Sequence, residues 1–527
     1  MNKEISRRRT LAIISHPDAG KTTLTEKLLL YGGALELAGS VTARKKQRDT
    51  SSDWMELEKK RGISISSTVL QFEYKDFKFN LLDTPGHKDF SEDTYRVLTA
   101  VDGVIMVIDA GKGIESQTIK LFEICKKRGV PIFTYMNKMD RPAKSPLELI
   151  DQLEEVLGID AYPVNWPIEN GVTFKGIYDR LESQVHLFQR VPGGSYKAPV
   201  SVHGITDDSF KHIVSEKIYK DFVEEIEMLD YAHTGFDVEA VLRGETTPVF
   251  FGSAANNFGV ELLLNGFLKY SSVPLPKVAK SGLIALEDPS FSAFIFKVQT
   301  NMNPQHRDCM VFARVCSGKF ERDIKVFHTN TGKEIRLSST HAVFGRDRET
   351  LNEAYPGDII GFVTTAHFRI GDTLSADKNI VFERIPRFAP ECFAYIQNIS
   401  TANYKAFRKG LEHLISEDIV QTFTMHNSSS ATPLLGAVGP LQFEVFQYRL
   451  KEEYGVESKL EMKDWKLLRW LETNVDPNEL DRISSYGFAH GVDDQKRQVL
   501  LFESPWALRN FEGNKSEIKL LDATIDL

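Results

Sequence analysis

The sequence predicts an α/β domain with a doubly wound parallel sheet, followed by a β-barrel domain and a C-terminal α+β domain. In the first half, near-continuous apolar runs at residues 11–15, 104–109, 132–136 and 249–252 alternate with helix-like runs. Strands that are buried on both faces of a parallel sheet have this pattern. From about residue 290 the runs are short, alternate in polarity and are separated by Gly- and Pro-containing turns, which is typical of barrel strands.

Two proline-containing segments, Ser271–Pro276 and Pro386–Pro390, mark the predicted domain boundaries. We expect domains at residues 1–277, 278–386 and 387–527, with a subdomain inserted in the first at about 141–248. The insertion includes an amphipathic run at 209–229. In the third domain an amphipathic helix is expected, because apolar side chains recur at helical spacing. They are Val438, Leu441, Val445 and Tyr448.

Composition and cysteine usage favour a cytoplasmic location. The chain has 527 residues, 42% of them hydrophobic, but no uninterrupted apolar run approaches the roughly 20 residues of a membrane span. The amino terminus is basic and lacks the apolar segment of a secretory signal. Because the cysteines show no C-x-x-C spacing, we expect reduced core thiols at Cys125, Cys309, Cys316 and Cys392. We expect a monomer with no membrane partner.

The net charge of −8 excludes a general attraction to nucleic acid, so any such contact requires local basic patches. Arg7–Arg9 and Arg44–Arg48 are the candidate patches. A solvated face or a loop explains each run at least as well.

Residues 15–23 have the pattern of a phosphate-binding loop. A strand-like run precedes them and a helix-like run follows, which is the context that such a loop requires. Backbone N–H groups would form an anion cradle, with Lys21 on the β- and γ-phosphates and Thr22 on Mg²⁺. The first position is Ser15 instead of glycine, so the turn requires a negative φ at Ser15. The predicted binding residues are Ser15, His16, Pro17, Asp18, Ala19, Gly20, Lys21, Thr22 and Thr23.

A second motif, Asp83, Thr84, Pro85, Gly86 and His87, ends another strand-like run. A carboxylate at this place can hold Mg²⁺ through water, and the N–H of Gly86 can approach a γ-phosphate closely. His87 is the candidate to orient the attacking water, so we expect His87 and Lys21 to act in catalysis. Taken alone, His87 would be read as a surface histidine in a turn.

A third motif, Asn137, Lys138, Met139 and Asp140, follows the run at 132–136. The Asp140 carboxylate can accept hydrogen bonds from guanine N1–H and N2–H₂, whereas adenine offers no donor there. After the run at 249–252, Ser253 and Ala254 are expected to supply a backbone N–H for guanine O6. The order and spacing of these motifs predict a P-loop GTPase domain that binds GTP or GDP with Mg²⁺.

With these motifs, the chain resembles the translational GTPases, and most closely the bacterial GTP-dependent release factor three family. Ile14–Thr23 looks like the phosphate loop of that family, and Ala354–Gly361 is similar to the barrel signature of the superfamily. Residues 52–56 and 61–64 resemble the first switch of the group, in which Ser64 takes the place of a threonine that closes on Mg²⁺. The resemblance spans essentially the whole chain.

The resemblance implies a ribosome-dependent GTPase that promotes dissociation of codon-reading release factors after the peptide has left. The implied partners are the ribosome, through its RNA and proteins, and those release factors. The region after the barrel is too short for the additional domains of a translocase. The chain also lacks the Gly-Gly-Gln motif of codon-reading factors, so we do not expect it to release the peptide itself.

Three alternatives stand beside this interpretation. The first is another ribosomal GTPase, such as a rescue or protection factor, against which the chain length and the phosphate-loop variant argue. The second is a metabolic GTPase of the sulfate-activation type, which would not depend on ribosomes. The third is a non-catalytic, GTP-gated binding protein, which a turnover assay would identify.

Overall fold

Strand β1 (Arg8–Ser15) lies at the centre of the amino-terminal sheet and all of its residues are buried. The computed structural model describes residues 1–34, 58, 64–189, 197, 200–232, 235–300, 309–329, 331–344, 347–364, 366–400, 403–426, 432–483 and 487–524. In this part of the chain the sheet order is β2-β3-β1-β4-β5-β11-β6, and β2 alone runs antiparallel to its neighbour. The other strands are β2 (Thr68–Tyr74), β3 (Phe77–Asp83), β4 (Gly103–Asp109), β5 (Ile132–Asn137), β6 (Asp160–Pro163) and β11 (Thr246–Phe251).

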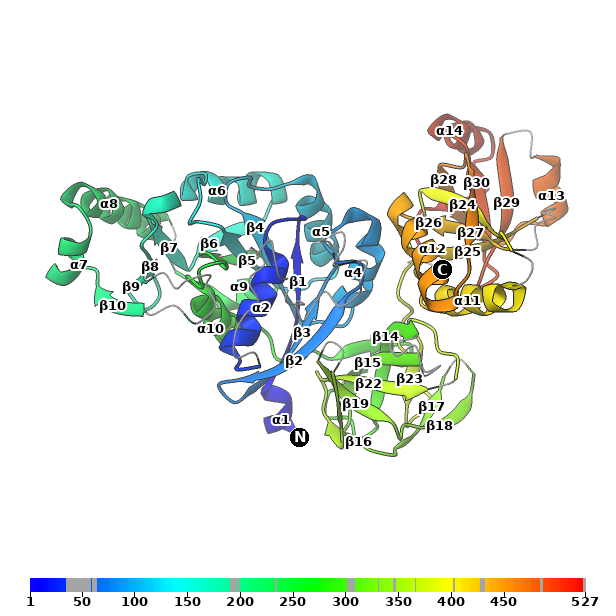
Figure 1. Cartoon of the computed structure of the whole chain (residues 1–527), viewed down its shortest axis with the longest axis horizontal. Helices are drawn as coiled ribbons and strands as arrows, with labels where there is room; N and C mark the ends of the chain where they lie inside the picture. Colours follow the sequence, from blue (N-terminus) through cyan, green and yellow to red (C-terminus); the bar gives the residue numbers. More distant parts are fainter. Residues whose placement is uncertain are drawn as a thin grey trace.

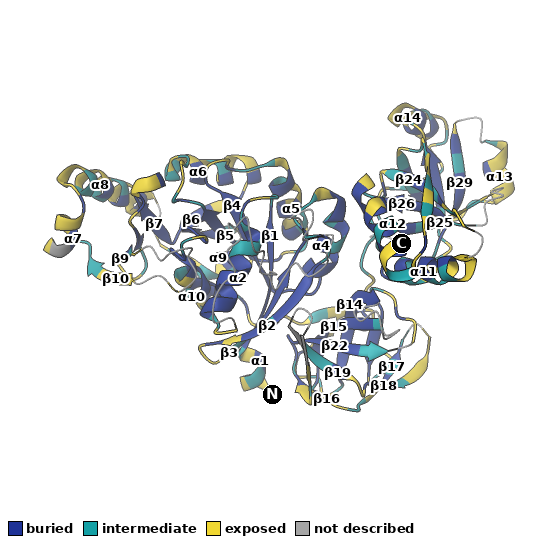
Figure 2. Ribbon diagram, in the orientation of Figure 1, coloured by how far each residue is buried: buried dark blue, intermediate teal, exposed yellow. Residues whose placement is uncertain are grey.

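Helices cover both faces of this sheet, so alternate residues of β1 enter different cores. Leu11 and Ile13 pack with residues of α2 and α10, whereas Ala12 and Ile14 pack with residues of α4, α5 and α6. The predicted doubly wound arrangement is therefore confirmed (Figures 1 and 2). The helices and helical turns of this region are α1 (Asn2–Ser6), α2 (Lys21–Tyr31), η1 (Lys88–Phe90), α4 (Ser91–Leu98), α5 (Ser116–Lys127), α6 (Pro146–Gln152), η2 (Leu153–Leu157), α9 (Val238–Leu242) and α10 (Val260–Tyr270).

The insertion forms a separate antiparallel sheet at the far end of the amino-terminal body (Figure 1). Its strands have the order β10-β9-β8-β7. The amphipathic run expected at 209–229 is divided between two helices, α7 and α8, because the chain is extended at Val214. The elements are β7 (Asn165–Ile168), η3 (Gly171–Thr173), β8 (Gly176–Asp179), β9 (Gln184–Phe188), β10 (Val200–Gly204), α7 (Asp208–Ile213) and α8 (Glu216–Ala232).

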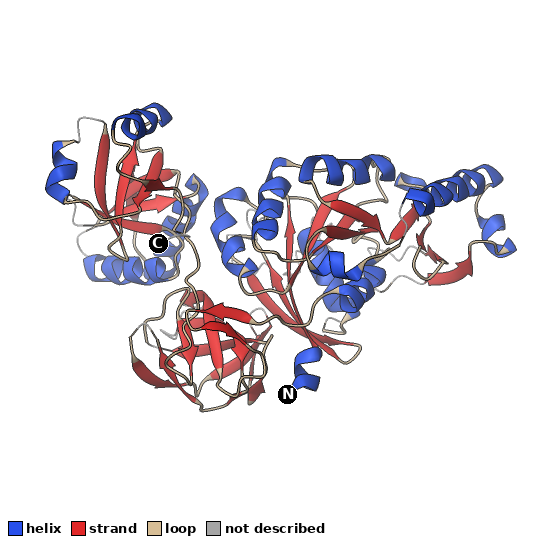
Figure 3. Cartoon of the chain, turned by 180° about the vertical axis from the view of Figure 1, so that it is seen from behind, coloured by secondary structure: helices blue, strands red, loops and turns tan. Residues whose placement is uncertain are grey.

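The middle of the chain forms a curled antiparallel sheet, as the predicted barrel requires (Figure 3). Its order is β18-β17-β23-β14-β15-β22-β19-β20, and short pairs β12-β13 and β16-β21 accompany it. The strands are β12 (Lys277–Ala279), β13 (Gly282–Ile284), β14 (Ser292–Thr300), β15 (Cys309–Ser317), β16 (Phe320–Glu321), β17 (Lys325–His328), β18 (Lys333–Arg336), β19 (Thr340–Phe344), β20 (Asp347–Thr350), β21 (Glu353–Ala354), β22 (Ile359–Thr364) and β23 (Thr373–Ser375).

The carboxy-terminal body combines one sheet, in the order β27-β24-β26-β25-β29-β30-β28-β31, with helices, as expected for an α+β domain. The amphipathic helix predicted there begins at Pro440, so Val438 precedes it. The elements are β24 (Cys392–Asn398), α11 (Tyr404–Ser416), β25 (Gln421–Met425), β26 (Leu434–Ala437), α12 (Pro440–Tyr454), β27 (Ser458–Lys463), β28 (Leu467–Leu471), α13 (Pro477–Arg482), β29 (Phe488–Asp493), β30 (Gln498–Phe502), α14 (Pro505–Asn514) and β31 (Leu520–Leu521).

The candidate basic patch Arg7–Arg9 belongs to an interface between the sheet and the barrel. Arg8 is 1% exposed, and its Nε donates to Asp358 Oδ2 over 3.0 Å. The Thr10 hydroxyl donates to the Gly357 carbonyl, so the barrel signature contacts the start of β1. Because Arg8 and Arg9 are buried, the interpretation as a nucleic-acid patch is wrong for them. Arg44–Arg48 lie outside the described residues.

The four cysteines are free thiols, as expected; Cys125 and Cys316 are buried, and Cys309 and Cys392 are partly buried. Burial raises the pKa of Cys125 to about 12, which keeps this thiol protonated at neutral pH. Within the described ranges, no helix combines the length and apolar character that a membrane crossing requires.

Candidate nucleotide-binding site

The predicted site residues lie where β1, β3, β5 and β11 end. Asp83 pairs with Ile13 and Asn137 with Asp109, so these strands finish at one edge of the sheet. Parallel strands present the loops at their carboxyl ends on one side of a sheet, and α/β proteins bind ligands there. The loops after β1, β3, β5 and β11 contain the residues that the sequence motifs singled out.

The loop at 15–20 turns through two residues of positive φ, Asp18 at 65° and Gly20 at 100°. Ser15 is not among the residues of positive φ, so this turn does not need a glycine at its first position. Glycine is required at Gly20 instead, because a Cβ there would overlap the Asn137 amide. The loop then enters α2 with Lys21, Thr22 and Thr23 in the first turn, where backbone N–H groups have no helical acceptors.

The Asn137 side chain joins three loops. Its Nδ2 donates to the Ala19 carbonyl over 2.8 Å, and its Oδ1 accepts from the N–H groups of Lys138 and Ala254 at 2.8 and 2.9 Å. The N–H of Ser253 donates to the Phe258 carbonyl. Both N–H groups of the Ser253–Ala254 pair are thus engaged within the protein, and their contact with guanine O6 stays a prediction.

Lys138 spans from the third motif to the phosphate loop. Its ammonium donates to Asp109 Oδ2 over 2.7 Å and to the carbonyl of Asp18 over 2.5 Å. Burial alone would raise the pKa of Asp109, but the Lys138 ammonium and the Gly111 N–H outweigh it and hold that pKa below its ordinary value. Asp109 was not predicted from the sequence, although the signal was present: a carboxylate ends the buried run 104–109 at the same sheet edge.

The other two residues of the third motif, Met139 and Asp140, differ in burial. Met139 is fully buried and packs in the hydrophobic core, and its N–H donates to the Gly252 carbonyl. Asp140 is half-buried at the start of the loop that follows. A half-buried carboxylate beside Lys138 is able to accept hydrogen bonds from a ligand.

A buried ion pair links the phosphate loop to the end of β3. Lys21 Nζ donates to Asp83 Oδ1 over 2.5 Å, and the two side chains are 6% and 2% exposed. The Thr84 hydroxyl donates to the Ile13 carbonyl and ties the two strands together. Pro85 is buried after it, and Gly86 approaches Pro17. His16 lies 3.1 Å from Glu115, across the loop.

His87 and Ser64 flank this loop system. The His87 imidazole is 33% exposed, and its Nδ1 accepts the N–H of Asp89 over 3.3 Å. Ser64 is half-buried just before Ile65, and Thr68 on β2 pairs with Asp83. The other first-switch residues, 52–56 and 61–63, lie outside the described residues.

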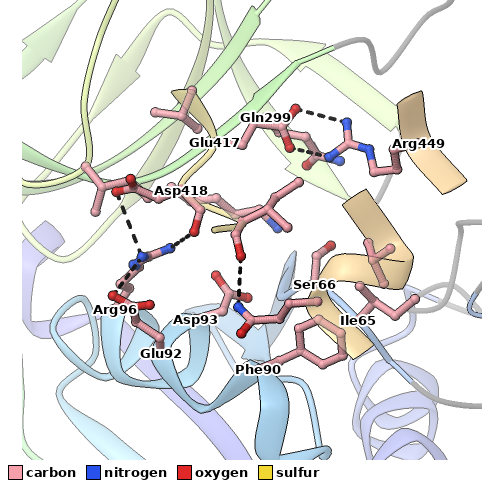
Figure 4. A pocket seen from close by; sticks show the side chains of 16 residues that line it. Ile65, Ser66, Phe90, Glu92, Asp93, Arg96, Gln299, Glu417, Asp418 and Arg449 are labelled. Atoms are coloured by element: carbon pink, nitrogen blue, oxygen red, sulfur yellow. Dashed lines mark hydrogen bonds and ion pairs between the residues drawn. The ribbon is translucent and has the colours of Figure 1, made fainter. Parts of the chain in front are cut away.

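Two other features lie apart from these loops. A cavity of about 70 Å³ opens where the three bodies meet, which is space for a few water molecules and too little for a nucleotide (Figure 4). In the carboxy-terminal body, Asp481 lies between His426 and His490, at 3.3 and 2.8 Å. The hydrogen bond with His490 is the largest cause that lowers the pKa of Asp481, and it accounts for this cluster.

Comparisons with known proteins agree with this architecture. A solved structure from Thermus thermophilus superimposes with a TM-score of 0.70 at 21% identity, covering 93% of this chain and 72% of that chain. Residues 6–272 match the model of the elongation factor Tu GTP binding domain. Residues 290–377 match elongation factor G domain 2, and residues 382–512 match the C-terminal domain of class II release factor RF3.

Curated relatives match over nearly the whole chain. Peptide chain release factor 3 of Gloeobacter violaceus is 54% identical over 517 residues, which cover 98% of this chain and 97% of the relative. The protein of the same name from Synechococcus elongatus is 49% identical, covering 99% of this chain and 93% of the relative. The chain therefore belongs to the peptide chain release factor 3 family of translation-termination GTPases.

Proposed function

We propose that the loops at the carboxyl edge of the amino-terminal sheet bind GTP and GDP through the motif residues. The observation that carries this proposal is the Asn137 amide, which joins the phosphate loop to the loops after β5 and β11. In the proposed complex the N–H groups around Gly20 and Lys21 face the phosphates. Asp140 reads the base, since guanine alone offers the paired donors that its carboxylate accepts.

The donor set in this site suits Mg²⁺. Thr22, Ser64 and Asp83 offer hydroxyl and carboxylate oxygens, the hard ligands that Mg²⁺ prefers. Lys21 contacts Asp83, which supports a shared site: Lys21 would hold the phosphates of a bound nucleotide, and Asp83 would help to hold Mg²⁺. When bound, Mg²⁺ would neutralise charge that develops on the phosphate oxygens.

His87 is the residue that we assign to the attacking water. Its imidazole is partly exposed, and the preceding residue, Gly86, lies close to Pro17 of the phosphate loop. With Nδ1 accepting the Asp89 N–H, a neutral ring has its proton on Nε2. An imidazole held in this way can orient a water molecule, and its protonated form can stabilise negative charge in the transition state.

At the level of the whole protein, we propose a monomeric, cytoplasmic factor that acts on the ribosome after peptide release. GTP binding would favour a state that ejects the codon-reading release factor, and hydrolysis would let this protein leave. The domain boundaries that we propose for this switch are 1–277, 278–386 and 387–527, with the insertion at about 141–248. The switch is supported by contacts between the bodies: the segments beside the phosphate loop touch both the barrel and the carboxy-terminal body.

The direct test is dissociation of a labelled codon-reading release factor from post-termination ribosomes. This protein with GTP is expected to accelerate dissociation relative to GTP alone. If the release factor does not dissociate faster, although the preparation still hydrolyses GTP on ribosomes, the protein has a different ribosomal role.

Replacing His87 by alanine is expected to leave GTP binding intact and to lower ribosome-stimulated turnover about a hundredfold or more, because the water loses its orienting group. The measurement is phosphate release at saturating GTP, with Lys88→Ala as the control on the neighbouring residue. Unchanged turnover in His87→Ala would remove this residue from the mechanism.

Asp140→Asn is expected to weaken GDP binding roughly a hundredfold, because the charged acceptor is lost and the new amide N–H group faces the guanine N2–H₂ donor. The new amide can instead donate to the O2 of xanthine while its carbonyl accepts N1–H, so xanthosine nucleotides should gain affinity. Competition between GDP and xanthosine diphosphate measures the switch. A variant that keeps its preference for GDP would disprove the base-reading assignment.

A further inference from the structure

Helix α12 of the carboxy-terminal body is capped by a residue of the amino-terminal body. Its own N-cap, Gly439, has no side chain to offer. The N–H of Leu441 in the first turn donates instead to Asp89 Oδ2 over 3.0 Å, across 352 positions of sequence. A carboxylate at a helix N-terminus satisfies a free N–H group and is favoured by the helix dipole. Asp89 is 2% exposed, so this contact is buried.

The contact between α12 and Asp89 depends on the absence of a side chain at Gly439. Its φ of −154° and ψ of 165° are extended values that any residue adopts, so the backbone does not require glycine. A Cβ at this position would, however, overlap the Asp89 carboxylate. Glycine is therefore the residue that lets α12 approach Asp89 closely.

Apolar side chains surround the cap and complete the docking surface. Phe90 and Ile65, from the two segments that flank the phosphate site, pack with Leu441 and Val445 on one face of α12. Leu441 and Val445 belong to the helical face that the sequence predicts. Figure 4 shows Phe90 and Ile65 beside the cavity between the bodies, where Arg96 bridges Glu92 and Asp418.

Asp89 also contacts His87. Its N–H donates to His87 Nδ1, and its Oδ1 lies 3.4 Å from the same nitrogen. Among the described residues this oxygen accepts no hydrogen bond, although it is buried. One residue thus contacts both the imidazole and the end of α12.

We propose that Asp89 is a positioning residue that couples docking of the carboxy-terminal body to the orientation of His87. When α12 is docked, Asp89 is fixed as the cap of this helix. The His87 imidazole is then held by its hydrogen bond from the Asp89 N–H. When α12 leaves, the turn relaxes and His87 is released toward the attacking water. The free protein is thereby held at low turnover. This inference rests on the role proposed for His87.

Gly439→Ala tests the coupling, because the added methyl group displaces α12 from Asp89 without replacing any residue of the nucleotide site. In full-length protein without ribosomes, kcat for GTP is expected to rise about fivefold. Loss of one helix cap increases the small undocked fraction by about this factor, and kcat increases in proportion. KM for GTP should stay constant. Amide exchange at Leu441, whose N–H loses its Asp89 acceptor, should be faster. Gly513→Ala, at a helical glycine with open space around it, is the matched control and should change neither.

Asp89→Ala removes the cap but keeps the backbone N–H, so it should raise kcat similarly, and adding Gly439→Ala should then have little further effect. The increase must also vanish in the Gly439→Ala, His87→Ala double variant. An unchanged or lower kcat, unchanged exchange at Leu441, or an increase that persists without His87 would overturn the coupling. If His87→Ala alone retains ribosome-stimulated turnover, the proposed catalytic role fails instead.

Discussion

The side-chain amide of Asn137 holds the nucleotide site together. One group donates to the phosphate loop and accepts from the loop after β11, while its neighbour Lys138 contacts the phosphate loop from the other side. A buried amide that makes all of these bonds has few alternative positions. The sheet fixes Asn137 itself, because it is the last residue of β5. Rigid strands thus position loops that have no regular structure of their own.

The same edge of the sheet also seats the other two bodies. Lys297 of the barrel donates to the Ser67 carbonyl, just beyond Ser64, and α12 docks on Asp89, just beyond His87. Burial lowers the pKa of Lys297, because the charged form of the amine is removed from water. Any nucleotide-dependent movement of these two segments therefore acts directly on interdomain contacts.

Much of this fold is predictable from the sequence, because strands buried on both faces are long apolar runs and the phosphate loop has a fixed spacing. Two features were not predictable. Arg8 and Arg9 look like part of a basic patch, but Asp358, the partner of Arg8, lies 350 positions away. Asp89 looks like an ordinary acidic residue, because the helix it caps belongs to another body. Local patterns give the elements, whereas contacts between bodies depend on packing that no local pattern contains.

Amide hydrogen exchange on the nucleotide-free protein tests most directly whether Asn137 joins these loops. Asn137→Ala is expected to accelerate exchange both at Ala254 and in the phosphate loop, because both contacts are lost. Asn137→Asp keeps the accepting oxygen and loses the donor, so only the phosphate loop should exchange faster. Unchanged protection of both loops in Asn137→Ala would contradict the account.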